Sequence, residues 1–257
     1  MRALSIAIFA AAALAQTPEK GAKPLAFEVT SVKPAQPGAQ AGGIRPMPGG
    51  QGYIATNIPL RLMFKLMYKI TDSQIVGGPE WMNNDRWDVQ AKAEKQANLD
   101  QLHEMFQTLL ADRFQLQFHK EKRTLPALVL TVDKGGSKMK VSESQDWTDI
   151  PIKPGGPGKI VGTRVPMNYL CWYLSQPANL PVVDETGLTG FYDFTLQLPP
   201  PPPGAERAPA DGRDAPSYDP MAEAFAALRE QLGLKMESHK APVEVYVIDR
   251  VERPSAN

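Results

Sequence analysis

The sequence predicts an α+β fold of two homologous modules, each built from a small, mostly antiparallel sheet and two helices. Three observations lead to this prediction. Short segments that alternate apolar and polar residues, as strands do, occur among segments with the apolar spacing of amphipathic helices. The order of these segments in the first part of the chain recurs in the second part. Proline and glycine clusters divide the segments at corresponding places.

The beginning of the chain is predicted to be a cleavable secretory signal peptide over 1–15. Arg2 provides a positive start, an apolar run follows over 3–14, and the small residues of Ala13-Leu14-Ala15 place the cleavage after Ala15. The run is shorter than the roughly 20 residues that span a bilayer. We therefore expect export to the periplasm or the exterior, with a disordered N-terminus over 16–26.

Composition excludes several functional classes. The chain has 28 Lys and Arg against 28 Asp and Glu, so it lacks the basic surface expected of a nucleic acid binding protein. No segment after the signal peptide is long and apolar enough for a membrane helix. With a single cysteine, Cys171, the chain forms no internal disulfide, so its stability has to come from packing.

The first module, predicted over 27–133, follows from its periodicity. After Pro59 the apolar residues have the spacing of one helix face, and a second helix is predicted after Asn98, which with Gln101 has the pattern of a capping box. Because Pro126 lacks an amide donor, we place it at the start or edge of a strand. The first helix face consists of Leu60, Met63, Phe64 and Met67. Strands are expected over 27–32, 87–91, 116–119 and 125–132.

The second module, predicted over 158–257, repeats this order. Its first helix follows Pro166, as the helix of the first module follows Pro59. Tyr192-Asp193-Phe194 repeats Trp87-Asp88-Val89. The matching helix face consists of Met167, Leu170, Cys171 and Leu174.

Two further segments complete the organisation. An inter-module segment is expected over 134–157, between the two modules. A proline-rich insertion over 199–218 opens with five prolines, which predict a stiff polyproline II spacer on the surface. Asp219 as N-cap and Pro220 in the first turn then predict the last helix.

The single cysteine is either a reactive thiol or a small buried apolar residue. The repeat favours the second interpretation, because Cys171 holds the position of Phe64 on the inward face of a helix. Burial raises the pKa of a thiol and makes it inert.

The sequence contains no motif for catalysis, a cofactor or a metal. His103-Glu104 lacks the second histidine of a zinc protease, since Gln107 stands at that position. The G-x-S-x-G motif, glycine-rich phosphate loops and clusters of Cys and His are also absent. Asp88 and Asp193 match across the modules, but a sequence does not show whether carboxylates converge. We therefore predict a non-enzymatic protein with no cofactor and no metal.

Four residues remain as candidates for binding. Trp81 is expected in a loop after Gly-Gly-Pro-Glu, and Trp147 lies in the inter-module segment, so each is either an exposed platform for a sugar or partner or an ordinary packing residue. His119 and His239 follow the second helix of each module at matching places. They are either strand-end residues inherited through the duplication or, with Asp88 and Asp193, candidates for a hydrolytic site.

Several longer stretches carry a family resemblance. They are Phe27–Pro34, Gly77–Trp81, Asp85–Val89, Leu109–Phe114, Val182–Phe194, Gln231–Lys235 and Lys240–Asp249. The chain resembles a large, uncharacterised family of exported proteins that is abundant in soil bacteria. The resemblance covers nearly the whole mature chain, although the proline-rich insertion is longer than expected. It implies no biochemical activity, and in some relatives the same domain is joined to a sensor-type membrane metallopeptidase.

A second resemblance concerns Val165 to Thr195. This stretch is similar to the short N-terminal modules of secretins and outer-membrane receptors, in which a V-P-L start, a helix, a V-V-D strand and a T-G turn follow one another. Those modules bind protein partners without catalysis, which is an analogy at the level of fold.

The sequence thus predicts an exported, non-enzymatic binding or adaptor protein whose partner is an envelope protein. Exposed strand edges would recruit this partner by β-augmentation. The alternative is a hydrolase or a glycan-binding protein with its site in a cleft between the modules. A concave pocket with converging polar groups between the modules would favour ligand binding or catalysis.

Overall fold

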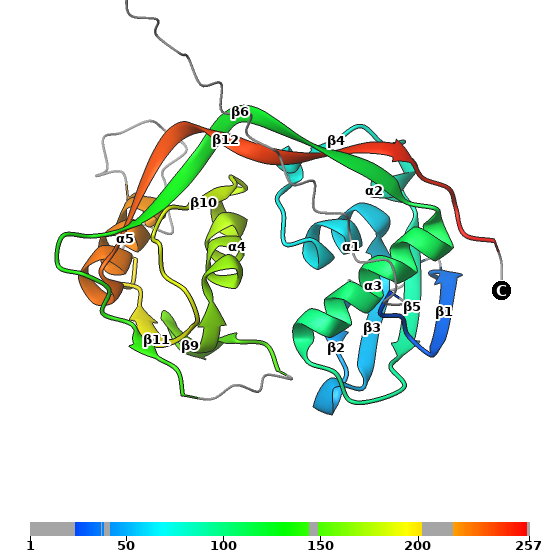
Figure 1. The fold of residues 1–257 in the computed structure, drawn as a ribbon, viewed down its shortest axis with the longest axis horizontal. Helices are drawn as coiled ribbons and strands as arrows, with labels where there is room; N and C mark the ends of the chain where they lie inside the picture. Colours follow the sequence, from blue (N-terminus) through cyan, green and yellow to red (C-terminus); the bar gives the residue numbers. More distant parts are fainter. Residues whose placement is uncertain (1–23, 37, 39–41, 144–148, 202–217, 256–257) are drawn as a thin grey trace, which may run out of the picture.

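The computed structural model describes residues 24–36, 38, 42–143, 149–201 and 218–255. It has a mixed α+β structure with three four-stranded sheets. Two long strands of one sheet form a ribbon that arches over the two halves of the molecule (Figure 1). The predicted signal peptide, Trp147 and most of the proline-rich insertion lie outside the described residues.

The two halves contain the same order of main elements. The first half consists of β1 (Val29–Pro34), β2 (Gly43–Pro46), β3 (Gly52–Pro59), α1 (Leu60–Met67), β4 (Ile75–Val76), α2 (Trp81–Asn84), β5 (Arg86–Lys92), α3 (Leu99–Phe114) and β6 (Gln117–Val132), with short 3-10 turns over Pro48–Gly50 and Asp72–Gln74. The second half consists of β7 (Lys140–Val141), β8 (Ile152–Gly156), β9 (Lys159–Pro166), α4 (Met167–Ala178), β10 (Val182–Asp184), β11 (Phe191–Gln197), α5 (Pro220–Ala227), a π-helical segment over Leu228–Leu232 and β12 (Leu234–Arg250).

The helix starts agree with their sequence signals. The Asn98 side chain accepts a hydrogen bond from the Gln101 amide at 2.9 Å, and the Gln101 side chain accepts one from the Asn98 amide, which confirms the predicted capping box. The predicted cap of α5 is also confirmed, since the Asp219 carboxylate accepts hydrogen bonds from two amides of the first turn. Pro59 and Pro166 precede α1 and α4 with the same extended backbone, at ψ 155° and 152°.

Two outer sheets have the same strand order. The first half forms the antiparallel sheet β1-β5-β3-β2, and the second half forms β7-β11-β9-β8. The segment expected to link two modules, 134–157, thus supplies the two outermost strands of the second of these sheets. The sequence does not predict these strands, because β7 has only two residues and β8, which contains proline and glycine, shows no periodicity.

The third sheet is shared by both halves and has the order β10-β6-β12-β4. Its centre is the antiparallel ribbon of β6 and β12, each of which extends over both halves (Figure 1). β10 of the second half pairs with β6 of the first, and β4 of the first half pairs with β12 of the second. The two halves therefore exchange strands, which differs from the predicted arrangement of one separate sheet in each module.

The two strands predicted over 116–119 and 125–132 are wrong, because β6 is one continuous strand. The Leu128 amide donates to the carbonyl of Pro181, the residue just before β10, so the amides of even-numbered β6 residues point away from β12. Pro126 is one of these residues, and its missing N–H costs no hydrogen bond of the ribbon. It therefore occupies a free strand edge as predicted, but in the middle of the strand.

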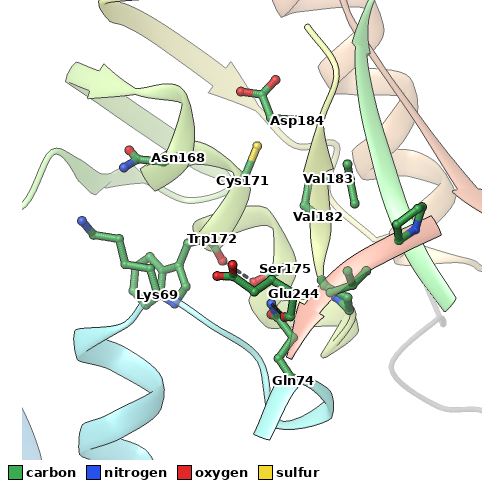
Figure 2. A pocket seen from close by; sticks show the side chains of 13 residues that line it. Lys69, Gln74, Asn168, Cys171, Trp172, Ser175, Val182, Val183, Asp184 and Glu244 are labelled. Atoms are coloured by element: carbon green, nitrogen blue, oxygen red, sulfur yellow. Dashed lines mark hydrogen bonds between the residues drawn. The ribbon is translucent and has the colours of Figure 1, made fainter. Parts of the chain in front are cut away.

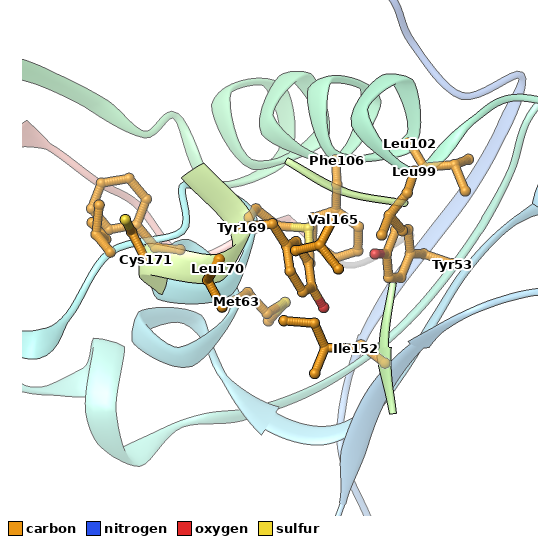
Figure 3. Close-up of a cluster of buried hydrophobic side chains, with 14 of the residues drawn as sticks. Tyr53, Met63, Leu99, Leu102, Phe106, Ile152, Val165, Tyr169, Leu170 and Cys171 are labelled. Atoms are coloured by element: carbon orange, nitrogen blue, oxygen red, sulfur yellow. The ribbon is translucent and has the colours of Figure 1, made fainter. Parts of the chain in front are cut away.

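One hydrophobic cluster runs through both halves (Figure 3). The predicted inward face of α1 is confirmed, since all four of its apolar residues are buried. On α4 three of the four predicted residues are buried, and the fourth, Leu174, is partly buried. Among the described residues, no helix combines the length and the apolar character needed to cross a membrane.

Candidate functional site: a cleft between the halves

A cleft lies between the two halves against the ribbon (Figure 2). Its larger cavity has a volume of about 350 Å³, and a smaller cavity of about 110 Å³ adjoins it, because Lys69 and Trp172 line both. The larger cavity is lined by Lys69 and Gln74 of the first half, by Asn168, Cys171, Trp172 and Ser175 of α4, by residues 181–184 and by residues 242–244 of the ribbon.

Corresponding residues of the two halves can be matched through the pairing of the shared sheet. Val182 pairs with Leu128, and Ile75 pairs with Tyr246 in the same way. From β3 to β4, the matching residue of the second half lies 107 positions later, as Val182 follows Ile75. On the ribbon it lies 118 positions later, as Tyr246 follows Leu128. We call residues matched in this way equivalent.

The larger cavity exists because one face of α4 carries small side chains. Asn168, Cys171 and Ser175 line it at helical spacing, and each is smaller than its equivalent in the first half. The equivalents are Arg61, Phe64 and Tyr68. In the first half Phe64 and Tyr68 pack against each other and against Phe118 and Tyr246, with ring centroids 4.7 to 5.8 Å apart.

The two nucleophile-bearing side chains of the cavity are not activated. Cys171 is buried as predicted, and burial, assisted by the nearby charge of Asp184, raises the pKa of its thiol to about 12. At neutral pH this thiol is protonated, so it is a poor nucleophile. The Ser175 hydroxyl donates to the Trp172 carbonyl at 2.6 Å.

Two carboxylates of the cavity lining have different partners. The Asp184 carboxylate accepts hydrogen bonds from the amide and the hydroxyl of Thr186 at 2.9 and 2.7 Å. The Glu244 carboxylate forms an ion pair with Lys120 at 2.8 Å, which lowers the pKa of Glu244. Across the cleft, the Gln74 side chain donates to the Glu244 carbonyl at 3.0 Å.

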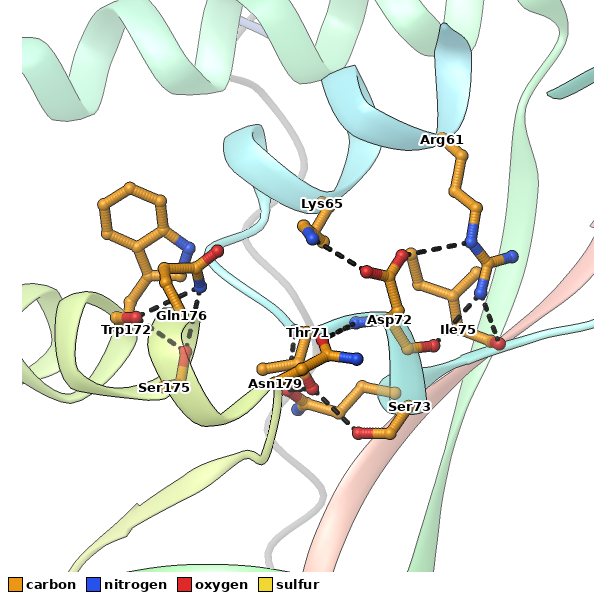
Figure 4. A network of polar contacts seen from close by, with 11 residues as sticks. Arg61, Lys65, Thr71, Asp72, Ser73, Ile75, Trp172, Ser175, Gln176 and Asn179 are labelled. Carbon is orange, nitrogen blue, oxygen red and sulfur yellow. Dashed lines mark hydrogen bonds and ion pairs between the residues drawn. The ribbon is translucent and has the colours of Figure 1, made fainter. Parts of the chain in front are cut away.

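A charged network occupies the first half where α1 meets the start of β4 (Figure 4). The Arg61 guanidinium donates to the Asp72 carboxylate at 3.3 Å, to the Asp72 carbonyl at 3.0 Å and to the Ile75 carbonyl at 3.3 Å. Lys65 donates to the same carboxylate at 2.8 Å. Burial acts to raise the pKa of Asp72, but Lys65 and Arg61 outweigh it and lower that pKa.

The smaller cavity contains a buried histidine. His103 Nε2 lies 2.8 Å from the Tyr53 hydroxyl, and within the described residues His103 Nδ1 and Trp172 Nε1 have no hydrogen-bond partner. Burial, with a contribution from Lys69, lowers the pKa of His103 to about 3, so its imidazole is neutral at physiological pH. Burial also raises the pKa of Tyr53.

The candidate histidines lie outside the cleft. His119 is exposed on the ribbon between Asp249 at 2.8 Å and Glu121 at 3.1 Å, and these carboxylates, Glu121 first, raise its pKa. His239 is exposed as well, 3.9 Å from Glu237. They were expected at matching places, but the residue equivalent to His119 is Glu237. The two histidines are thus offset by two positions along the ribbon.

The other candidates also lie away from the cleft. Trp81 begins the short helix α2 and does not lie in a loop; it is half-buried, with the Arg253 guanidinium 5.1 Å from its ring centroid. Asp88 and Asp193 accept hydrogen bonds from the backbone amides of Asn57 and Arg164 at 2.8 and 2.7 Å. They occupy equivalent places in two separate sheets, so the structure does not bring them together.

Sequence reasoning did not select the residues that line the cleft. One signal for them was present, because Cys171 in the position of Phe64 means a loss of side-chain volume at a buried position. From the sequence alone, the same difference indicates only that Cys171 is buried. The contributions of Lys69, Gln74 and Glu244 depend on how the halves face each other, which no local pattern encodes.

Comparisons with known proteins assign a family. A family model described as "Protein of unknown function (DUF3738)" matches residues 61–251. No curated protein and no solved structure matches the chain. Across the described parts of the chain, no group of three or more His, Cys, Asp or Glu side chains is placed to hold a metal ion.

Proposed function

Since the chain belongs to the DUF3738 family, whose function is unknown, we propose from its geometry that it is an exported, non-enzymatic adaptor of the cell envelope that binds a partner in the cleft between its halves. The observation that carries this proposal is the cavity of about 350 Å³ with polar groups from both halves. Clefts of this kind, largely formed before a ligand arrives, are typical binding sites.

The two halves, we infer, are homologous modules that arose by duplication. This is supported by the common order of their elements, by the matching strand exchange of β4 and β10, and by the equivalent backbone hydrogen bonds of Asp88 and Asp193. Two modules that share an ancestor need the same packing to fold. The loss of side-chain volume on one face of α4 therefore points to a role beyond folding.

The cleft is a better candidate for partner binding than the free edges of the ribbon. These edges carry Lys122 and Pro126 on β6 and Lys240 and Pro242 on β12. Lysine and proline at strand edges hinder the addition of another strand. We therefore propose that the partner binds in the cleft, and not by β-augmentation at a strand edge as the sequence predicts.

The chemistry of the cleft supports binding over the hydrolase alternative. Its thiol is protonated, its serine hydroxyl donates to a carbonyl, and His119, His239, Asp88 and Asp193 lie elsewhere. The resemblance of Val165–Thr195 to adaptor modules of the bacterial envelope is consistent with this role.

Export is part of the proposal and has its own test. Removal of the predicted signal peptide after Ala15 would leave Gln16 as the first residue of the mature protein. Mass spectrometry of the native protein from culture medium and periplasm should find this N-terminus. An intact N-terminus in a cytoplasmic fraction would refute export.

The binding role is tested with the mature chain as bait in envelope extracts. Asn168→Trp fills the cleft from an exposed position of α4, so it should abolish capture of the partner without unfolding the protein. The control, His119→Ala, changes the exposed ribbon and should leave capture unchanged. If the cleft variant, shown by circular dichroism to be folded, captures the same partner equally well, the proposal is wrong.

A further inference from the structure

The starts of β4 and β10 differ in that only the start of β4 has an arginine side chain beside it. At the start of β4, the Arg61 guanidinium donates to the Ile75 carbonyl and to Asp72. The equivalent residues at the start of β10 are Val182 for Ile75 and Asn168 for Arg61. Both Val182 and Asn168 line the larger cavity of the cleft. The second half therefore has an open cavity where the first half holds its own cation.

One acceptor that Arg61 uses in the first half, the Ile75 carbonyl, has a counterpart in the second, whereas Asn179 stands in the place of the Asp72 carboxylate. The Pro181 carbonyl accepts from the Leu128 amide, and the Glu185 amide donates to the Leu130 carbonyl, so odd-numbered residues of this strand bond to β6. Alternation along the strand then directs the Val182 carbonyl to the free edge, as with Ile75.

The charges around this place differ between the halves, and the second half has more carboxylates and fewer cations. Trp172 is equivalent to Lys65, Asp184 to Gly77 and Glu244 to Pro126. With Arg61 replaced by Asn168 and Asp72 by Asn179, the second half has lost two cations and one carboxylate, and it has gained two carboxylates and an indole around the same space.

Lys69 does not supply the missing cation. Its ammonium donates to Asp100 at 2.8 Å, and Figure 2 shows the end of the side chain directed away from Gln74 and Glu244. Lys69 thus contributes mainly its alkyl stem to the cavity.

We propose that the larger cavity binds a guanidinium or alkylammonium group supplied by a ligand, in the place that Arg61 fills in the first half. The Val182 carbonyl and the Asp184 carboxylate accept its hydrogen bonds, and the Trp172 ring provides an aromatic face for the cation. This inference rests on the proposed binding role and names the chemistry that the cleft recognises. The group comes either from a basic side chain of a protein partner or from a free amine.

The first test uses isothermal titration calorimetry of the mature protein with n-butylguanidinium, n-butylammonium and the neutral, similarly shaped n-butylurea. Both cations should bind at least about ten-fold more tightly than the urea. Asp184→Asn keeps the acceptor for Thr186 but removes the charge, so it should weaken binding of the cations by about ten-fold. Asp112→Asn, on the exposed side of α3, is the matched control and should change nothing.

The second test restores the missing cation within the chain. Asn168→Arg should abolish binding of n-butylguanidinium, because its guanidinium occupies the cavity as Arg61 does in the first half. Asp112→Arg, which adds the same group on the exposed side of α3, is the control and should retain binding. Retained affinity in a folded Asn168→Arg variant, or equal affinity of the wild type for n-butylurea and the cations, would overturn the inference.

The source of the cation follows from a third comparison. The peptide acetyl-Gly-Arg-Gly-amide should bind at least about ten-fold more tightly than n-butylguanidinium if the natural ligand is a protein side chain, and equally if it is a free amine. If no cation binds although Asn168→Trp still abolishes partner capture, this inference fails and the proposed function stands.

Discussion

At the residue scale, each outer sheet depends on one carboxylate that holds a bulge. Asn57 and Arg164 have left-handed backbones, with φ 51° and 56°, and their amides donate to Asp88 and Asp193. A positive φ is uncommon for residues other than glycine, although asparagine tolerates it better than arginine, so the hydrogen bond helps to hold the conformation.

We predict that Asp88→Ala lowers the free energy of unfolding by about 1–3 kcal/mol, because it leaves a partly buried amide without its acceptor. Asp88→Asn should cost less, since its amide oxygen can accept the same hydrogen bond. Urea unfolding followed by circular dichroism measures both values. Equal losses for the two variants would show that the hydrogen bond is not the cause.

The buried His103 makes stability depend on pH. Its folded pKa of about 3 lies below the ordinary value of 6.5, so the unfolded chain binds the proton more readily. Stability from this group is complete above pH 6.5 and is lost as the pH falls toward 3. Between pH 7 and pH 5 we expect a loss of about 2 kcal/mol in the free energy of unfolding.

Urea unfolding at pH 5, 6 and 7 tests this expectation, with His103→Gln as the variant that should lack this loss. His119 provides the control, because its raised pKa predicts the opposite direction, with its contribution present below pH 6.5 and lost at higher pH. A wild type that loses no more stability than His103→Gln between pH 7 and pH 5 would contradict the assignment of His103 as a buried neutral side chain.

The sequence was informative about single buried positions and uninformative about the space around them. Spacing placed Phe64 and Cys171 correctly in the interior, because helical periodicity is a local property. Whether a cavity results depends on Tyr68 and Ser175, and on residues of the ribbon far away in the sequence. Side-chain volume has to be compared across the whole site before such a cavity becomes apparent.

At the element scale, the ribbon determines which backbone positions tolerate proline. Even-numbered residues of β6 direct their amides away from β12, to an edge that β10 covers only at 128–130, and odd-numbered residues direct theirs to β12. Lys122 and Arg123 are adjacent and both exposed, so they form a matched pair for testing this alternation.

We predict that Arg123→Pro lowers the free energy of unfolding by about 3 kcal/mol, because it removes a hydrogen bond to β12 and introduces a clash within the ladder. Lys122→Pro should cost distinctly less. Chemical unfolding of the two variants gives the comparison. The register of the ribbon described above would be wrong if the costs were reversed.

Elements with capping signals were predictable, and elements without local signals were not. Asn98 and Asp219 marked helix starts correctly, because a cap is made by residues within one turn. β7 and β8 lacked a pattern, since short outer strands are defined by their neighbours in the sheet. Pro126 was misleading because its effect depends on which edge of the strand is free.

At the scale of the whole molecule, the strand exchange makes each half incomplete without the other. β4 pairs with β12, β10 pairs with β6, and one hydrophobic cluster extends through both halves. Neither half alone can form the shared sheet. The duplication inferred from the sequence was compatible with two separate domains, and only the pairing in space distinguishes that arrangement from this one.

We therefore predict that fragments 16–133 and 134–257 each lack stable tertiary structure when produced alone and regain it when mixed. Two-dimensional NMR should show poorly dispersed amide signals for each fragment and a dispersed spectrum for the mixture. A well-dispersed spectrum from either fragment by itself would show that the strand exchange is not needed for folding.

Thr124 and Pro242 pair in the middle of the ribbon, and they are also equivalent residues of the two halves. The point that relates one half to the other therefore lies at this pair. A polypeptide of one half only could close the same ribbon with a second copy of itself, but both of its cavities would then be identical by symmetry. In a single chain the two sites are encoded separately. One can keep the arginine that completes its structure, while the other leaves that place open for a group brought by another molecule.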